Sequence, residues 1–200
     1  VITGDKSLRT RPMKRIVDPL RLMGAQIMGR GNDSLAPLTI RGGDLNGIEY
    51  ALPVASAQLK SSLTIAALFA NGETNLHQPA QSRDHTERML SAMGASITKD
   101  GNTLKIKPCP SLNPVNIRVS GDISSASFWI VAAIAHPNAR IRLDNVGINP
   151  TRSGIVNVLQ NMGANISLIN TRSEGGEPVS DMIIESSDLV GVDIDKDMIP

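Results

Sequence analysis

Cysteine and aromatic residues are scarce in this sequence. Cys109 is the only cysteine, and aromatic residues make up 2% of the chain. One cysteine cannot form an internal disulfide, and nothing in the sequence indicates an oxidising compartment. The core must therefore be built from Leu, Ile, Val, Met and Ala. With 40% apolar residues in 200, the chain can fill one large domain or two small ones.

The sequence also lacks an excess of charge and any long apolar run. Its net charge of +1 predicts no nucleic-acid partner, since such proteins usually carry a clearly basic face. No apolar run reaches the roughly 18 residues of a membrane helix, and no secretory signal is visible. We therefore expect no membrane partner and a cytoplasmic protein. The first residue is Val1 and the last is Pro200, from which we expect a piece of a longer protein.

Several motifs of catalysis and cofactor binding are absent as well. Gly29-Arg30-Gly31 is not followed by the Gly and Lys of a phosphate-binding Walker loop. The histidines do not have metal-ligand spacing, and no G-x-S-x-G motif is present. The sequence predicts no metal, no cofactor and no serine nucleophile.

What the sequence does contain is a long internal repeat. Met23-Gly24-Ala25 recurs as Met93-Gly94-Ala95 and as Met162-Gly163-Ala164, at offsets of 70 and 69 residues. This period is too long for the common solenoid repeats of about 20–50 residues. We expect each copy to end an amphipathic helix and to open a strand, with the glycine in a left-handed cap.

The helices expected before these three turns span 11–23, 84–93 and 152–162. In the first, Pro12 suits the opening turn, and Pro19 predicts a kink or a fresh start. In the second, Met89, Leu90 and Met93 are expected to face inward.

A second type of helix repeats too. Small hydroxylated residues precede alanine-rich apolar runs at 56–70 and 124–135, which predicts well-buried helices packed closely on a sheet. Strands are expected at 38–41, 46–51, 74–77, 96–98, 103–107, 115–119, 140–143, 165–169 and 181–185. This order of elements predicts an α/β or α+β fold with mixed sheets.

The start of the helix at 56–70 is the best candidate for binding chemistry. Ser56, Ala57 and Gln58 would place unpaired backbone N–H groups and the positive end of the helix dipole around an anion such as phosphate. The Gln58 amide can also bind sugar-like hydroxyls. The alternative is that Ser56 only caps the helix. Lys60 is expected to be solvated.

Arginines precede both of the first two amphipathic helices. Arg11 and Arg83 each stand just ahead of such a helix. A guanidinium group holds phosphate or carboxylate at two points, so both are candidate anion ligands. The alternative for each is an ordinary surface arginine.

Residues around the second amphipathic helix and the second alanine-rich helix allow further roles. Asp84 and Glu87 fit a variant of the capping box, and Asp84 and His85 could instead act as acid and base. Ser124 and Ser125 repeat the Ser56 pattern, so they could bind phosphate. The repeat alone also explains them.

Together these segments resemble the 5-enolpyruvylshikimate-3-phosphate synthase family. The resemblance runs in order through the whole chain and rests on five motifs: Leu8-Arg9-Thr10-Arg11-Pro12-Met13, Ala55-Ser56-Ala57-Gln58-Leu59-Lys60-Ser61, Ser82-Arg83-Asp84-His85-Thr86-Glu87, Gly121-Asp122-Ile123-Ser124-Ser125-Ala126 and Asn149-Pro150-Thr151-Arg152-Ser153-Gly154. The second and third motifs look like those of the glyphosate-tolerant bacterial class.

The resemblance implies an inside-out α/β barrel of two domains, each with three β-α-β-α-β-β units. Residues 1–119 would hold about two units of the domain that binds shikimate 3-phosphate, and residues 120–200 about one unit of the second domain. The family transfers the enolpyruvyl group of phosphoenolpyruvate to the 5-hydroxyl of shikimate 3-phosphate, without a metal. Glyphosate inhibits this family.

The resemblance also implies roles for individual residues. Ser56, Ala57, Gln58, Ser82 and Arg83 match positions that bind shikimate 3-phosphate. Arg11 and Gln58 match positions of the phosphoenolpyruvate site. No catalytic residue of the family has a counterpart here, because its catalytic aspartate follows an Ile-Pro pair and this chain ends at Ile199-Pro200.

Three interpretations follow from the resemblance. The first is a fragment of this synthase, which we expect to be inactive alone. The second is a fragment of UDP-N-acetylglucosamine enolpyruvyl transferase, which shares the fold and the chemistry but usually differs at 55–60 and 82–87. The third is a non-catalytic half whose partner is the complementary segments of the same enzyme.

Overall fold

The computed structural model describes residues 1–194. The chain forms two compact units, one of residues 1–82 and 93–113 and the other of residues 83–92 and 114–200. The expected last segment of the second domain, with Ile199-Pro200, lies outside the described residues.

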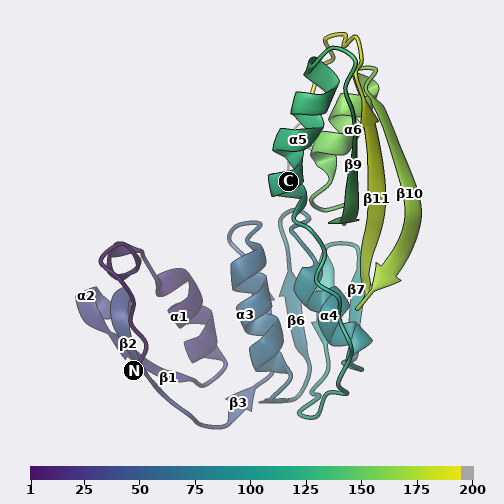
Figure 1. The fold of residues 1–200 in the computed structure, drawn as a ribbon. Helices are drawn as coiled ribbons and strands as arrows, with labels where there is room; N and C mark the ends of the chain where they lie inside the picture. The colour runs from purple at the N-terminus through teal and green to yellow at the C-terminus, as the bar shows by residue number, and fades with distance from the viewer. Residues whose placement is uncertain (195–200) are drawn as a thin grey trace. The chain divides into compact units, whose positions relative to one another are not determined.

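The first unit contains most of the strands (Figure 1). Its helical elements are η1 (Leu8–Thr10), α1 (Lys14–Leu22), α2 (Arg30–Asp33) and α3 (Ala57–Ala67). Its strands are β1 (Gln26–Gly29), β2 (Leu35–Arg41), β3 (Leu45–Asn46), β4 (Glu49–Ala51), β5 (Ala70–Asn71), β6 (Thr74–His77), β7 (Ile97–Asp100) and β8 (Thr103–Ile106). The segment labelled α2 is a left-handed turn, since φ is 61° at Gly31 and 59° at Asn32.

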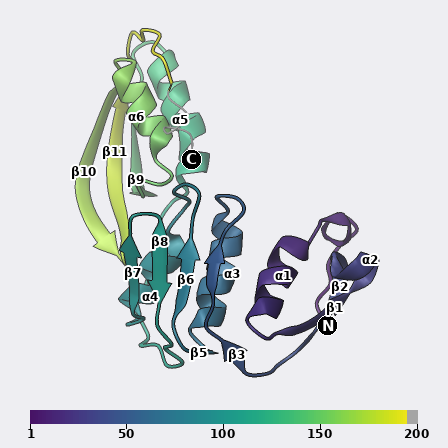
Figure 2. The ribbon, with the colours of Figure 1, turned by 180° about the vertical axis from the view of Figure 1, so that it is seen from behind.

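Three sheets form in the first unit. β1 and β2 pair antiparallel, β3 and β5 pair parallel, and the four-stranded sheet has the order β4-β6-β8-β7. In the last sheet β4 and β6 are parallel and the other pairs are antiparallel. α3 lies alongside β6 in both ribbon views (Figure 2). The buried side chains here are aliphatic, as the lack of aromatics requires: Val17, Met23, Leu59, Leu63, Leu76, Leu104 and Ile106.

The second unit is built from three helices and three strands. They are α4 (His85–Ala92), α5 (Ile123–Ala135), β9 (Arg140–Gly147), α6 (Gly154–Asn161), β10 (Asn165–Glu174) and β11 (Glu177–Glu185). The strands form an antiparallel sheet of order β10-β11-β9. α5 and α6 pack on this sheet around an apolar core that includes Ile130, Val156, Met182 and Ile184. The mixed sheets and the helices of both units confirm the predicted α/β fold class.

The sequence repeat is a repeat of topology. Gly121 forms a parallel bridge with Val146 of β9, just as β4 pairs with β6. The next strands then follow in the same order, so that Gly121-β9-β11-β10 corresponds to β4-β6-β8-β7. A period near 70 residues therefore encodes one sheet with its two helices.

The three Met-Gly-Ala segments are confirmed as helix-ending turns. Gly24, Gly94 and Gly163 have φ values of 105°, 95° and 98°. Each lies just after a helix and within three residues of a strand. Left-handed backbone is accessible to glycine at little cost, and it lets the chain reverse from helix to strand.

Several local expectations were wrong. The first helix begins at Lys14 rather than 11, so Pro12 lies outside it, and Pro19 is buried within a continuous α1. Helical hydrogen bonding resumes past the proline, where the Pro19 carbonyl accepts the Met23 N–H at 3.2 Å. Met89 is 43% exposed rather than inward-facing. Within the described residues, 115–119 forms no strand, and the Val119 carbonyl is bound by the Asn145 side chain instead.

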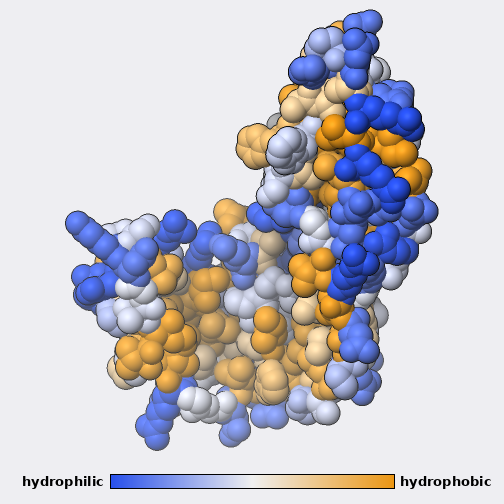
Figure 3. All heavy atoms as spheres, viewed as in Figure 1, coloured by the Kyte–Doolittle hydropathy of each residue, from blue (hydrophilic) through white to orange (hydrophobic). Residues whose placement is uncertain are grey.

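The alanine-rich helices are less completely buried than expected. α5 buries Ile130 but exposes Phe128, Trp129 and Val131, because the sheet of its own unit covers only one side of the helix. Apolar residues lie at the surface of both units in the space-filling view (Figure 3).

The glycine turns make a prediction about stability. A Cβ at Gly163 would meet only the Asp188 carbonyl, at an ordinary 3.5 Å, so Gly163→Ala tests the backbone conformation alone. We expect a loss of about 1–2 kcal/mol in the free energy of unfolding, measured in urea. Gly191→Ala is the matched control, since its Cβ would enter open space without a positive φ. An equal effect of both substitutions would contradict the account.

Candidate functional site

The start of α3 has the geometry of an anion-binding helix terminus. Ser56 has extended backbone, and its Oγ accepts a hydrogen bond from the Leu59 N–H at 3.3 Å. The capping role of Ser56 is thus confirmed. Ala57 and Gln58 are the first two residues of the helix, where N–H groups have no partner within the helix. A neutral hydroxyl cap leaves the positive end of the helix dipole uncompensated.

A buried lysine lies directly behind this terminus. Lys60 is 1% exposed, and its Nζ donates to the Ser82 carbonyl at 3.4 Å. The expectation of a solvated lysine was wrong, because protein groups replace water around the ammonium. Residue 82, at the far end of the chain segment that follows β6, is thereby tied to α3.

The Ser82 side chain is also oriented. Its Oγ donates to Gln78 Oε1 at 3.0 Å, and Gln78 is itself buried and bonded through its N–H to the Asn102 carbonyl. The first unit therefore brings together Ser56, Ala57 and Gln58 with Ser82 through Lys60. Sequence reasoning selected four of these five residues but misread the lysine.

An arginine that the sequence analysis missed contacts the same terminus. Arg15 Nη2 donates to Gln58 Oε1 at 3.0 Å, which orients the amide. Arg15 lies in the first turn of α1, and its partner Gln58 is 43 positions away in the sequence, so no local pattern pointed to this contact.

The two predicted arginines stand apart from these contacts. Arg11 directly follows η1 and lines a shallow cavity with Asp5, Ser7 and Leu8. Arg83 is exposed and follows Ser82 in the chain, but it is the first residue of the second unit. That Arg83 shares one phosphate with Ser56 stays a prediction.

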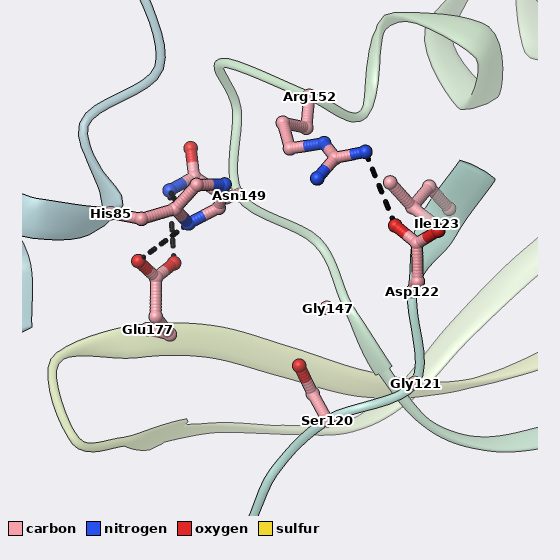
Figure 4. Close-up of a pocket in the computed structure, with 9 residues that line it drawn as sticks. All are labelled: His85, Ser120, Gly121, Asp122, Ile123, Gly147, Asn149, Arg152 and Glu177. Atoms are coloured by element: carbon pink, nitrogen blue, oxygen red, sulfur yellow. Dashed lines mark hydrogen bonds and ion pairs between the residues drawn. The ribbon is translucent and has the colours of Figure 1, made fainter. Parts of the chain in front are cut away.

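A second polar cluster lies within the second unit, beside a cavity of about 210 Å³ (Figure 4). Asn149 from the loop after β9 donates to Asp84 Oδ1 at 2.8 Å and to Glu177 Oε2 at 2.9 Å. His85 Nδ1 donates to Glu177 Oε1 at 2.8 Å. His85 comes from α4, Glu177 from β11 and Asn149 from the loop between β9 and α6. These three side chains point toward one another in Figure 4.

The charge of Asp84 is set by this cluster. Partial burial alone would raise the pKa of Asp84, but hydrogen bonds from Arg88 and Asn149 and the Arg88 charge together lower it. Arg88 Nε lies 3.0 Å from Asp84 Oδ2. Asp84 directly precedes α4, and its carboxylate binds the Arg88 and Asn149 side chains; that it caps the helix stays a prediction. Asp84 is thus held as a structural anion and is poorly suited to proton transfer.

The start of α5 differs from that of α3 in one decisive way. Asp122 caps α5, and its carboxylate accepts from the N–H groups of Ser124 and Ser125, both at 3.2 Å. Arg152 in turn lies 3.2 Å from Asp122 (Figure 4). A carboxylate already occupies this terminus and would repel a phosphate. The phosphate interpretation of Ser124 and Ser125 loses its support here, and the repeat accounts for them.

Comparison with known proteins identifies the family behind this geometry. A family model described as EPSP synthase (3-phosphoshikimate 1-carboxyvinyltransferase) matches residues 1–198. The chain belongs to the EPSP synthase family. The 3-phosphoshikimate 1-carboxyvinyltransferases of Desulforudis audaxviator and Bacillus subtilis are 53% and 49% identical over the whole of this chain.

Solved structures of the family agree with the fold. An EPSP synthase from Acinetobacter baumannii superimposes with a TM-score of 0.92 at 47% identity, over 98% of this chain and 45% of that one. The chain also spans only 47% and 46% of the length of the two curated EPSP synthases named above. It thus corresponds to about half of a synthase. In the part of the chain that the structure describes, no helix is long and apolar enough to cross a membrane.

The lowered pKa of Asp84 predicts a pH dependence of stability. Its folded pKa lies below the ordinary 3.8, so the folded state binds fewer protons than the unfolded state in this range. The stabilisation is complete above 3.8 and is lost as the pH falls through the folded pKa. We expect Asp84→Asn to flatten the fall in unfolding free energy between pH 5 and about pH 2, measured in urea at each pH. A variant as steep as the unmodified protein would contradict the assignment.

Proposed function

We propose that this chain supplies part of the substrate site of a 3-phosphoshikimate 1-carboxyvinyltransferase. In this reaction the 5-hydroxyl of shikimate 3-phosphate gives up its proton and its oxygen bonds to C2 of phosphoenolpyruvate, while C3 accepts a proton. Elimination of phosphate and of a proton from C3 then regenerates the double bond. The observation that carries the proposal is the neutral-capped start of α3, with Ser82 tied to it through Lys60, in a chain of this family.

The proposed ligands of shikimate 3-phosphate are Ser56, Ala57, Gln58, Ser82 and Arg83. The first two offer a hydroxyl and a backbone N–H at the positive end of α3, and Gln58 offers an amide already oriented by Arg15. Ser82 offers a hydroxyl, and Arg83 offers a guanidinium that can bind phosphate at two points. These groups match a ligand that combines phosphate with ring hydroxyls.

Phosphoenolpyruvate is the proposed second ligand, with Arg11 and Gln58 as its contacts in this chain. Glyphosate would compete for the same groups. The proton-transferring residues are assigned to the half of the synthase that this chain does not match.

We further propose that residues 1–119 belong to the shikimate 3-phosphate domain and residues 120–200 to the second domain. The complementary segments of the synthase are the proposed partners of this chain.

The role of Arg83 can be tested directly in a full-length synthase that contains this chain. Removing one charge-assisted contact costs about 1.5–3 kcal/mol. Arg83→Ala should therefore raise the dissociation constant for shikimate 3-phosphate by about tenfold to over a hundredfold, measured by calorimetry. Arg41→Ala, an exposed arginine at the end of β2, is the matched control and should leave the affinity unchanged.

Two outcomes would overturn this assignment. Equal affinity in Arg83→Ala and the unmodified protein would remove Arg83 from the site. Tight binding of UDP-N-acetylglucosamine, with none of shikimate 3-phosphate, would instead indicate the UDP-sugar transferase.

The isolated 200-residue chain should show no synthase turnover. Catalysis needs proton delivery and charge stabilisation around phosphoenolpyruvate in a site shielded from water, and the chain matches about half of its relatives. Phosphate release would be measured with saturating substrates, alone and after addition of the complementary segments. Turnover by the chain alone within about a hundredfold of an intact synthase would contradict the prediction, since removing a set of catalytic groups costs far more than this.

A further inference from the structure

The Asn149 carboxamide is the centre of the polar cluster in the second unit. It is 2% exposed. Its Nδ2 donates to Asp84 and Glu177, as described above, and its Oδ1 accepts from the Thr151 N–H at 2.9 Å and the Thr151 hydroxyl at 2.7 Å. Donors and acceptors of this amide are therefore all engaged, and Figure 4 shows it facing His85 and Glu177.

This arrangement places two negative charges close together, which costs electrostatic free energy. One amide holds two carboxylates, which repel each other, and each carboxylate needs a further cationic or hydrogen-bonding partner. Arg88 is this further partner for Asp84, and His85 is the partner for Glu177. Polar networks of this kind add little stability over apolar packing. An amide whose donors and acceptors are all engaged, as in Asn149, nevertheless holds its partners in one geometry.

Asp84 is the member of this network that lies directly after Arg83 in the chain. Its carboxylate is bound by Arg88 Nε at 3.0 Å and by Asn149 Nδ2 at 2.8 Å. Its carbonyl accepts the Arg88 N–H at 3.1 Å. These contacts hold both the side chain and the backbone carbonyl of residue 84, and the residue directly before it is Arg83. When the backbone next to a substrate-binding side chain is already ordered, less conformational entropy is lost on binding.

We infer that Asn149 is a positioning residue for Arg83, because its bond to Asp84 fixes the backbone from which the Arg83 guanidinium reaches the substrate phosphate. The inference rests on the proposed function, and it adds a residue from the loop after β9 to the determinants of shikimate 3-phosphate affinity. Asn149 itself touches no substrate in this account.

A double-mutant cycle in a full-length synthase tests the inference. Asn149→Ala should raise the dissociation constant for shikimate 3-phosphate by about fivefold, within the usual range of coupling between interacting residues. In the Arg83→Ala background, the same substitution should change it by less than about twofold. The KM for phosphoenolpyruvate should stay within about twofold, since a merely structural loss would affect both substrates. Asn157→Ala, an exposed asparagine on α6, is the matched control.

The outcomes distinguish a failure of the positioning role of Asn149 from a failure of the binding role of Arg83. Loss of affinity by the same factor in both backgrounds would overturn the positioning role of Asn149. No effect of Arg83→Ala alone would instead overturn the proposed function of Arg83. If Asn149→Ala does not fold, Thr151→Val takes its place in the cycle, because it removes only the hydroxyl that orients the Asn149 amide. The same pattern of coupling is then expected.

Discussion

The ammonium group of Lys60 lies inside the first unit, and a charge removed from water must be bound by polar protein groups. One of them is the Ser82 carbonyl. Through this contact the start of α3 and the residue before Arg83 are held at a fixed separation, although 22 positions in the sequence separate Lys60 from Ser82. Substrate-binding groups gain from such prior ordering, because less freedom is lost when the ligand arrives. The candidate site therefore depends on a lysine that is buried within the first unit.

Duplication explains both the similarity and the difference between the two alanine-rich helices. α3 and α5 occupy the same place in sheets of the same strand order. α3 is capped by a serine hydroxyl, whereas α5 is capped by the Asp122 carboxylate. A neutral cap leaves the helix terminus attractive to anions, and a charged cap fills it. One residue at the cap thus separates a candidate binding terminus from a purely structural one.

Local patterns in the sequence predicted much of the fold. The Met-Gly-Ala turns, the strand Thr74–His77 and the capping serine were found because turn chemistry, alternation and caps act over a few residues. Lys60, Arg15 and Asn149 could not be found in this way. Their roles depend on partners 22, 43 and 65 positions away, and a single sequence carries no local signal for such pairs. The segment 115–119 forms no strand in the described structure; only Gly121, beyond it, bridges to β9, and an alternating pattern alone does not show whether a strand will pair.

The central claim is that the start of α3 binds the phosphate of shikimate 3-phosphate. The most direct measurement is a titration of the isolated, ¹⁵N-labelled chain with this ligand, following backbone amide shifts. The account predicts saturable shifts of the Ala57 and Gln58 amides, with smaller shifts at Ser124 and Ser125, whose N–H groups already bind Asp122. Shikimate without its phosphate should leave the α3 amides unmoved. Saturable shifts at the start of α5 with none at the start of α3 would contradict the claim.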